Sequence, residues 1–170
     1  MRPETEQSIV ARLAPLRSVN VVVRAVPNIP AELGEPTGNG EVLLICKRGK
    51  AEKPSGMGRF QQEVNDEWHL TLTLKHIRSE AGVMTFINAI IALLLGFRPE
   101  QCGKLCLGSY EILGIDQMGF WRADLMFMAT RLVLETSEDE AIALLSQITF
   151  ETEVWDTPVE PDLVIPETAE

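Results

Sequence analysis

Histidine, cysteine and carboxylate side chains are the usual components of catalytic and metal sites, and this sequence offers few of them in a useful arrangement. Its two histidines, His69 and His76, lie in a stretch that alternates like a β-strand. Because the two positions differ by an odd number, the side chains would point to opposite faces of one strand and could not share a metal ion. The sequence has no local Ser/His/Asp signature. We therefore expect no catalytic residue, no metal site and no cofactor.

The three cysteines, Cys46, Cys102 and Cys106, fit reduced thiols better than a metal site or a disulfide. An odd number of cysteines without a secretory context favours a reducing compartment. Cys102 and Cys106 are four positions apart, whereas zinc knuckles and redox pairs have two residues between their cysteines. We expect Cys102 and Cys106 to be small buried side chains.

A basic run over residues 47–59 is the first candidate for binding a partner. It contains five basic residues against one acidic residue, Glu52. The basic residues are Lys47, Arg48, Lys50, Lys53 and Arg59. Proline and glycine are frequent in this run, so we expect a loop. One interpretation is a solvated loop, and the other is a loop that docks on an acidic partner surface.

The acidic residues concentrate towards the other end of the chain. The chain has 170 residues, a mass of 18.9 kDa, a formal net charge of −10 and a pI of about 4.7. Residues 151–170 carry seven acidic residues and no basic one. This charge argues against sequence-specific binding of nucleic acid. Trp155 lies in the acidic segment, where a large aromatic side chain indicates an anchor for a partner protein.

The centre of the sequence combines a strand with an apolar helix. Residues 67–77 place Trp68, Leu70, Leu72 and Leu74 on one face, with polar side chains between them, which predicts a strand with one buried face. Residues 80–95 then predict a helix that is apolar most of the way round and that needs cover on two sides. It ends at Gly96, a residue that favours a left-handed helix stop.

A membrane span is the competing interpretation of that helix. The uncharged run over residues 81–97 is 17 residues long, whereas a span needs about 20. Its neighbours on both sides are strand-like, so we expect no membrane span. The N-terminal residues lack the apolar core of a secretory signal, and we expect a cytoplasmic protein.

The remaining elements predict an α+β fold. A helix over 4–16 precedes strands over 19–26 and 41–48, and strands over 104–115 and 120–135 form a hairpin. A capping box at Ser137 opens a helix over 136–150. The order α-β-β-β-α-β-β-α indicates a mostly antiparallel sheet flanked by helices. We expect residues 1–135 to form this domain, 136–150 an additional helix, and 151–170 an acidic arm that contains prolines.

Three segments together resemble a family of small bacteriophage tail proteins, the tail-completion or tail-terminator group. They are the helix around residues 9–13, the helix end over 93–99 (LLLGFRP), and the hairpin that turns through Gly119 and Trp121 into an alternating strand. The resemblance covers residues 5–135 and implies a sheet flanked by helices. It also implies a non-enzymatic role, in which six copies form a ring that closes the end of a tail tube or sheath. Some relatives are similar to cap components of phage-like contractile injection systems.

Two functions remain open at this point. The resemblance favours a structural assembly protein, a hexameric terminator or cap, whose partners would be other copies of itself and the tube or sheath subunits of a tail-like particle. The alternative is a small soluble α+β enzyme or ligand-binding module. For the first function, the candidate interface residues are the five bases of the basic run and Trp155.

Overall fold

The computed structural model describes residues 3–54, 60–78 and 82–135. Five strands form one sheet in the order β1-β2-β3-β5-β4. Their bounds are Val21–Ala25 (β1), Gly40–Ala51 (β2), Gln61–Leu74 (β3), Cys106–Ile115 (β4) and Trp121–Leu134 (β5). β1 and β2 are parallel and the other three pairs are antiparallel. The predicted α+β class with a mostly antiparallel sheet is therefore confirmed.

Strand β3 is the centre of the sheet, between β2 and β5. It begins six residues earlier than predicted and ends at Leu74, so His76 lies beyond the strand. The predicted buried face is confirmed, because Trp68, Leu70, Leu72 and Leu74 are at most 2% exposed. Their alternation with polar residues is what a strand covered on one side requires.

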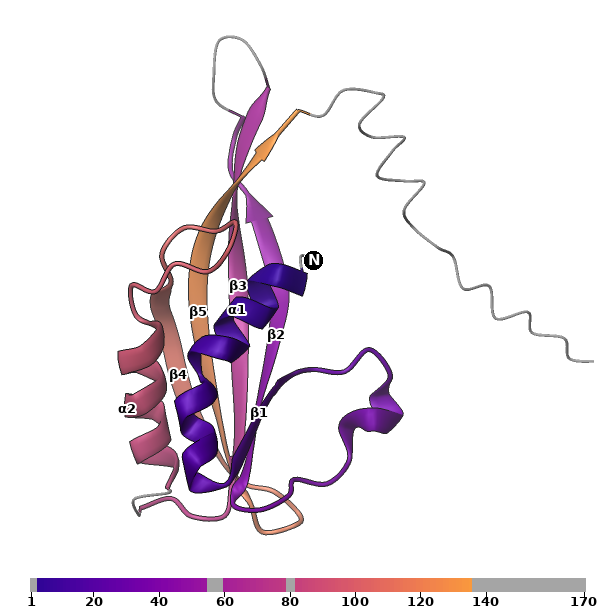
Figure 1. Cartoon of the computed structure of the whole chain (residues 1–170), viewed down its shortest axis with the longest axis vertical. Helices are drawn as coiled ribbons and strands as arrows, with labels where there is room; N and C mark the ends of the chain where they lie inside the picture. The colour runs from indigo at the N-terminus through magenta and orange to yellow at the C-terminus, as the bar shows by residue number, and fades with distance from the viewer. Residues whose placement is uncertain (1–2, 55–59, 79–81, 136–170) are drawn as a thin grey trace, which may run out of the picture. The chain divides into compact units, whose positions relative to one another are not determined.

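Helices α1 (Pro3–Arg12) and α2 (Val83–Leu94) lie over the same face of the sheet (Figure 1). The core joins both helices to the sheet, with Ile9 from α1 and Phe86, Ile87 and Ile90 from α2. α2 ends where predicted, since Gly96 has a φ of +74°. It begins at Val83, later than the predicted start at residue 80, because Gly82 is its N-cap with an extended backbone (φ −92°, ψ 161°). Residues 79–81 lie outside the described residues.

The second cover predicted for α2 is partial. Arg12, the last residue of α1, donates a hydrogen bond to the carbonyl oxygen of Leu93 at 3.0 Å and lies 5.4 Å from the centre of the Phe97 ring. Met84 and Leu95 stay 40% and 57% exposed. One face of α2 is thus buried against the sheet, whereas a second face stays partly exposed beside the contacts made by Arg12. No helix among the described residues is long and apolar enough to span a membrane.

The N-terminal helix is shorter than predicted. α1 ends at Arg12, and a separate 3₁₀ turn, η1 (Ala14–Val19), follows with Pro15 near its start. Proline has no N–H to donate and clashes with the preceding turn, so an α-helix cannot continue through it. A second 3₁₀ turn, η2 (Pro30–Leu33), lies in the connection between β1 and β2.

The predicted hairpin between β4 and β5 is confirmed. Its turn is held by Asp116, whose Oδ1 accepts hydrogen bonds from the backbone N–H groups of Met118 and Phe120, both at 2.9 Å. An Asp at the start of a tight turn stabilises it through such bonds.

One end of the sheet has only three strands. β1 pairs with β2 no further than Leu44, and β4 pairs with β5 no further than Met128. Residues 48–51, 61–66 and 129–134 therefore continue as β2, β3 and β5 alone, beyond the helices in Figure 1. We call this part the three-stranded end. The predicted helix 136–150 and arm 151–170 lie outside the described residues, so the division of the chain at residue 135 stays a prediction.

Candidate partner-binding surface at the three-stranded end

The basic run is not a loop over most of its described length. Lys47, Arg48 and Lys50 lie within β2, and only Lys53 follows the strand. A register shift between Cys46 and Arg48 marks a bulge at Lys47. The sequence predicted this strand only as far as Arg48, because its apolar residues end at Cys46. Pairing with β3 continues β2 to Ala51. Arg59 and Trp155, the other predicted interface residues, lie outside the described residues.

The four described bases are exposed but not equivalent. Arg48 donates to Glu67 on β3 at 2.6 Å, so its charge is already compensated. Lys47, Lys50 and Lys53 have no acidic partner within ion-pair distance among the described residues. Their part of β2 is also an edge of the sheet. Lysines on an edge strand hinder the addition of a further strand, so these residues can protect the edge, bind an acidic surface, or do both.

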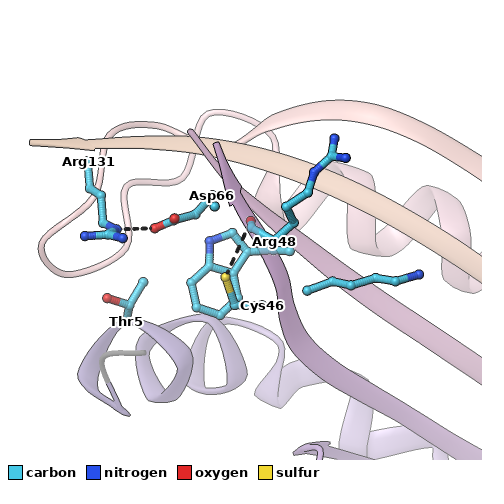
Figure 2. A pocket seen from close by; sticks show the side chains of 8 residues that line it. Thr5, Cys46, Arg48, Asp66 and Arg131 are labelled. Atoms are coloured by element: carbon cyan, nitrogen blue, oxygen red, sulfur yellow. Dashed lines mark hydrogen bonds and ion pairs between the residues drawn. The ribbon is translucent and has the colours of Figure 1, made fainter. Parts of the chain in front are cut away.

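A pocket of about 320 Å³ lies beside this basic edge (Figure 2). Its lining residues come from α1, β2, β3 and β5: Thr5, Cys46, Lys47, Arg48, Gly49, Asp66, Trp68 and Arg131. Asp66 lies within β3 and is only 5% exposed. Arg131 Nε donates to Asp66 Oδ2 at 2.6 Å, and this ion pair compensates the buried charge.

The position of the Asp66 carboxylate depends on a glycine opposite. Gly49 is the cross-strand neighbour of Asp66, and a Cβ atom at Gly49 would lie 2.8 Å from Asp66 Oδ1. Any larger residue at position 49 would therefore displace the carboxylate. In Figure 2 the Arg48 side chain extends away from the Asp66–Arg131 pair, which leaves that pair as the charged centre of the pocket.

Cys46 also lines this pocket, but its thiol is poorly suited to reaction. Burial, with a further contribution from the charge of Asp66, raises its pKa to about 11. Only the thiolate is a good nucleophile, and at neutral pH this group is almost entirely the thiol. The Trp68 indole nitrogen is buried without a hydrogen-bond partner among the described residues. The pocket thus has the character of a packed polar junction between elements and not of a reaction centre.

A second polar cluster lies on the sheet face opposite the helices. Thr71 donates to Asp124 Oδ1 at 2.6 Å, and His69 Nδ1 lies 3.5 Å from Asp124 Oδ2. These residues link β3 to β5 across the sheet. Within the described residues, no group of three or more His, Cys, Asp and Glu side chains is placed to hold a metal ion.

The structure separates the two cysteines that the sequence treated alike. Cys102 is 5% exposed, as predicted, whereas Cys106 is exposed and the prediction for it is wrong. Cys106 begins β4, an edge strand, and pairs with Met128 on the face away from the helices.

We expect a thiol reagent to distinguish the three cysteines in the native chain at pH 8. Cys106 should be alkylated first because it is exposed. Cys46 and Cys102 should react at least about tenfold more slowly, because Cys102 is buried and the pKa of the half-buried Cys46 is raised. Peptide mass spectrometry over time measures the three rates. Replacing Cys102 and Cys106 by Ala should cost about 1–3 kcal/mol of stability and leave assembly intact. Equal rates at all three thiols, or loss of assembly, would contradict this assignment.

The fold and the surface define a class of protein: a small α+β chain with exposed strand edges and exposed charged side chains. The sequence profile of the Gp37 protein family matches residues 9–152, and the chain belongs to this family. No curated protein sequence matches it.

A solved structure shares the fold. It is a chain in the virion of the native gene transfer agent (GTA) particle, with a TM-score of 0.52 at 15% sequence identity. The match covers 75% of this chain and 94% of the other. The family membership and the shared fold confirm the resemblance seen in the sequence, to a phage-tail-like family of structural proteins.

Proposed function

We propose that this protein is a structural subunit of a phage-tail-like particle and that its copies form a ring that closes the end of the tail tube or sheath. Membership of the Gp37 family and a fold shared with a chain of the GTA virion support the proposal that the protein is a subunit of such a particle. The particle is a phage tail or a contractile injection system assembled in the cytoplasm. The protein acts there by binding other subunits and not as an enzyme.

The observation that best supports a ring is that one sheet has two different exposed apolar patches. The first patch is on β4 and its turn, where four large side chains are 52–59% exposed: Tyr110, Leu113, Ile115 and Met118. The second is at the three-stranded end, on the sheet face away from the helices, where Leu132 and Leu134 are 52% and 49% exposed. Apolar clusters of this kind on a soluble chain usually mark interaction sites.

Two unlike patches suit a head-to-tail contact. In a cyclic ring each subunit presents one surface to the neighbour on one side and a different surface to the neighbour on the other. The basic edge of β2 adds a charged surface, which we propose docks on an acidic face of the tube or sheath subunit. Trp155 and Arg59 belong to the same proposal as contacts with a partner.

Sizing by light scattering tests the ring. Six chains of 18.9 kDa have a mass of about 113 kDa, and we expect this species to appear as the protein concentration rises. A chain that assembles only on its tube would stay monomeric alone, so the same measurement is made on particles assembled from purified tube and sheath subunits. A chain that is monomeric alone and absent from the ends of such particles would overturn the proposed function.

A further inference from the structure

Among the described residues, the far half of β5 has no strand beside it on the side away from β3, and this edge lacks the usual protection. Other free edges of this sheet are blunted: β1 has five residues, β4 is interrupted by two register shifts, and the outer half of β2 carries lysines. Short strands, bulges and lysines are the ordinary devices that prevent unwanted strand addition. Leu132, Val133 and Leu134 on β5 have none of these and are 38–52% exposed.

The backbone polar groups of this segment point outward, where a further strand can pair with them. The carbonyl oxygen of Thr130 accepts a hydrogen bond from Gly103 at 2.6 Å, so the polar groups of Thr130 point away from β3. Strand residues alternate in direction, and Leu132 and Leu134 must therefore point the same way. The N–H of Glu135 bonds to Phe60 on the β3 side, in agreement with this alternation. No described strand lies beside Leu132 and Leu134 to accept or donate.

A groove of about 410 Å³ runs along this edge. Its lining residues are Arg98, Gln101, Cys102 and Gly103 on one side, Thr130, Arg131 and Leu132 of β5 on the other, and Glu63 of β3. Arg98 donates to the carbonyl oxygen of Cys102 at 3.2 Å and has no acidic partner among the described residues. Arg131, in contrast, is already bound to Asp66. The groove thus offers a strand edge beside the exposed apolar side chain of Leu132, with charged side chains of both signs, Arg98 and Glu63, in its lining. A strand edge with apolar side chains fits an extended apolar segment.

The sequence of this chain contains one such segment in its acidic part. Asp162, Leu163, Val164 and Ile165 lie between Pro161 and Pro166. Valine and isoleucine favour strands, and the two prolines, which cannot donate a backbone hydrogen bond, limit any pairing to about four residues. The free edge over residues 131–134 has the same length.

We propose that residues 162–165 of one copy add a strand to the free edge of β5 in a second copy. The inference rests on the proposed ring, because strand addition from each copy to the next is a head-to-tail contact of the kind that a cyclic assembly requires. It also assigns a partner to the apolar patch at the three-stranded end.

Photo-crosslinking between isotopically distinct full-length chains tests this contact. A chain labelled with ¹⁵N carries a photoreactive amino acid in place of Val164 and is mixed with an unlabelled chain. We expect crosslinks from the ¹⁵N chain to the unlabelled peptide that contains Leu132–Leu134, and few from a matched probe at Val154. Crosslinks found only within the ¹⁵N-labelled protein, or crosslinks to peptides that do not contain Leu132–Leu134, would overturn the proposal.

A second variant tests the backbone pairing itself. Leu134→Pro in the unlabelled chain removes an N–H that points outward and makes no bond to β3, so the sheet should fold with an unchanged circular dichroism spectrum. The crosslink yield should fall about tenfold, because the added strand loses a hydrogen bond and its close approach. An unchanged yield would contradict strand addition. Rings that form without the crosslink would refute this contact alone, whereas crosslinked dimers without rings would refute the ring alone.

Discussion

Replacing Leu72 by Asp should abolish soluble expression of this protein. Leu72 is fully buried at the centre of β3, where it lies opposite Val42 on β2 and Ala123 on β5. The introduced carboxylate would lie among the apolar side chains of the core, and an unpaired buried charge costs several kcal/mol. Since a domain of this size is stable by about 5–15 kcal/mol, this single change removes most or all of that stability.

Ser109→Asp is the matched control. Ser109 is an exposed position on β4, so the same carboxylate stays in water there. We expect this variant to express normally and to unfold within about 0.5 kcal/mol of the unchanged protein, as measured by urea denaturation. A soluble, cooperatively folding Leu72→Asp variant would show that the face of β3 towards the helices is not the core.

The sequence predicts those parts of the fold that a local residue pattern is enough to specify. The buried face of β3 follows from strict alternation, and the end of α2 follows from Gly96 and Pro99. The hairpin between β4 and β5 follows from two long apolar runs with a short polar connection. In each case the local pattern and the tertiary environment agree.

The three-stranded end could not be predicted in this way. The part of β2 after Cys46 is rich in basic residues and glycine, and its extended conformation depends on pairing with β3. Asp66 resembles an exposed charge in the sequence because its partner, Arg131, is 65 residues away. Neither the edge strand nor the buried ion pair leaves a local pattern.

The sequence therefore identified the candidate surface by its charge correctly, but assigned it to the wrong kind of element. The exposed bases Lys47 and Lys50 were identified by their charge, and the structure places them on an edge strand and not in a loop. Arg131 and Gly49 were missed, since nothing in their neighbourhoods along the sequence links them to Asp66. Only long-range pairing brings these residues together.

Reversing Lys47, Lys50 and Lys53 to Glu should leave the free subunit folded and stop particles from being capped. All three side chains are exposed and without an acidic partner among the described residues, so the fold loses no contact there. Arg48 is left unchanged because reversal would break its ion pair with Glu67. Each contact with an acidic partner should contribute only about 0–1 kcal/mol, but a ring repeats it in every copy.

The expected result is a set of tubes of uncontrolled length, visible by electron microscopy, together with a subunit whose melting temperature is unchanged within a few degrees. Capping by the unchanged protein should weaken as the salt concentration rises, since exposed charges are screened within about 10 Å at 0.1 M salt. Reversal of Lys75, Arg78 and Arg122, three other exposed bases, is the matched control and should preserve capping.

The triple reversal also separates the two roles that the structure allows for these bases. A glutamate on an edge strand hinders strand addition as a lysine does, so edge protection survives the change of sign. Docking on an acidic surface does not survive it, because attraction becomes repulsion. Particles of normal length and normal salt resistance after the reversal would therefore mean that the bases only protect the edge of β2, and that the cap is held by the apolar patches alone.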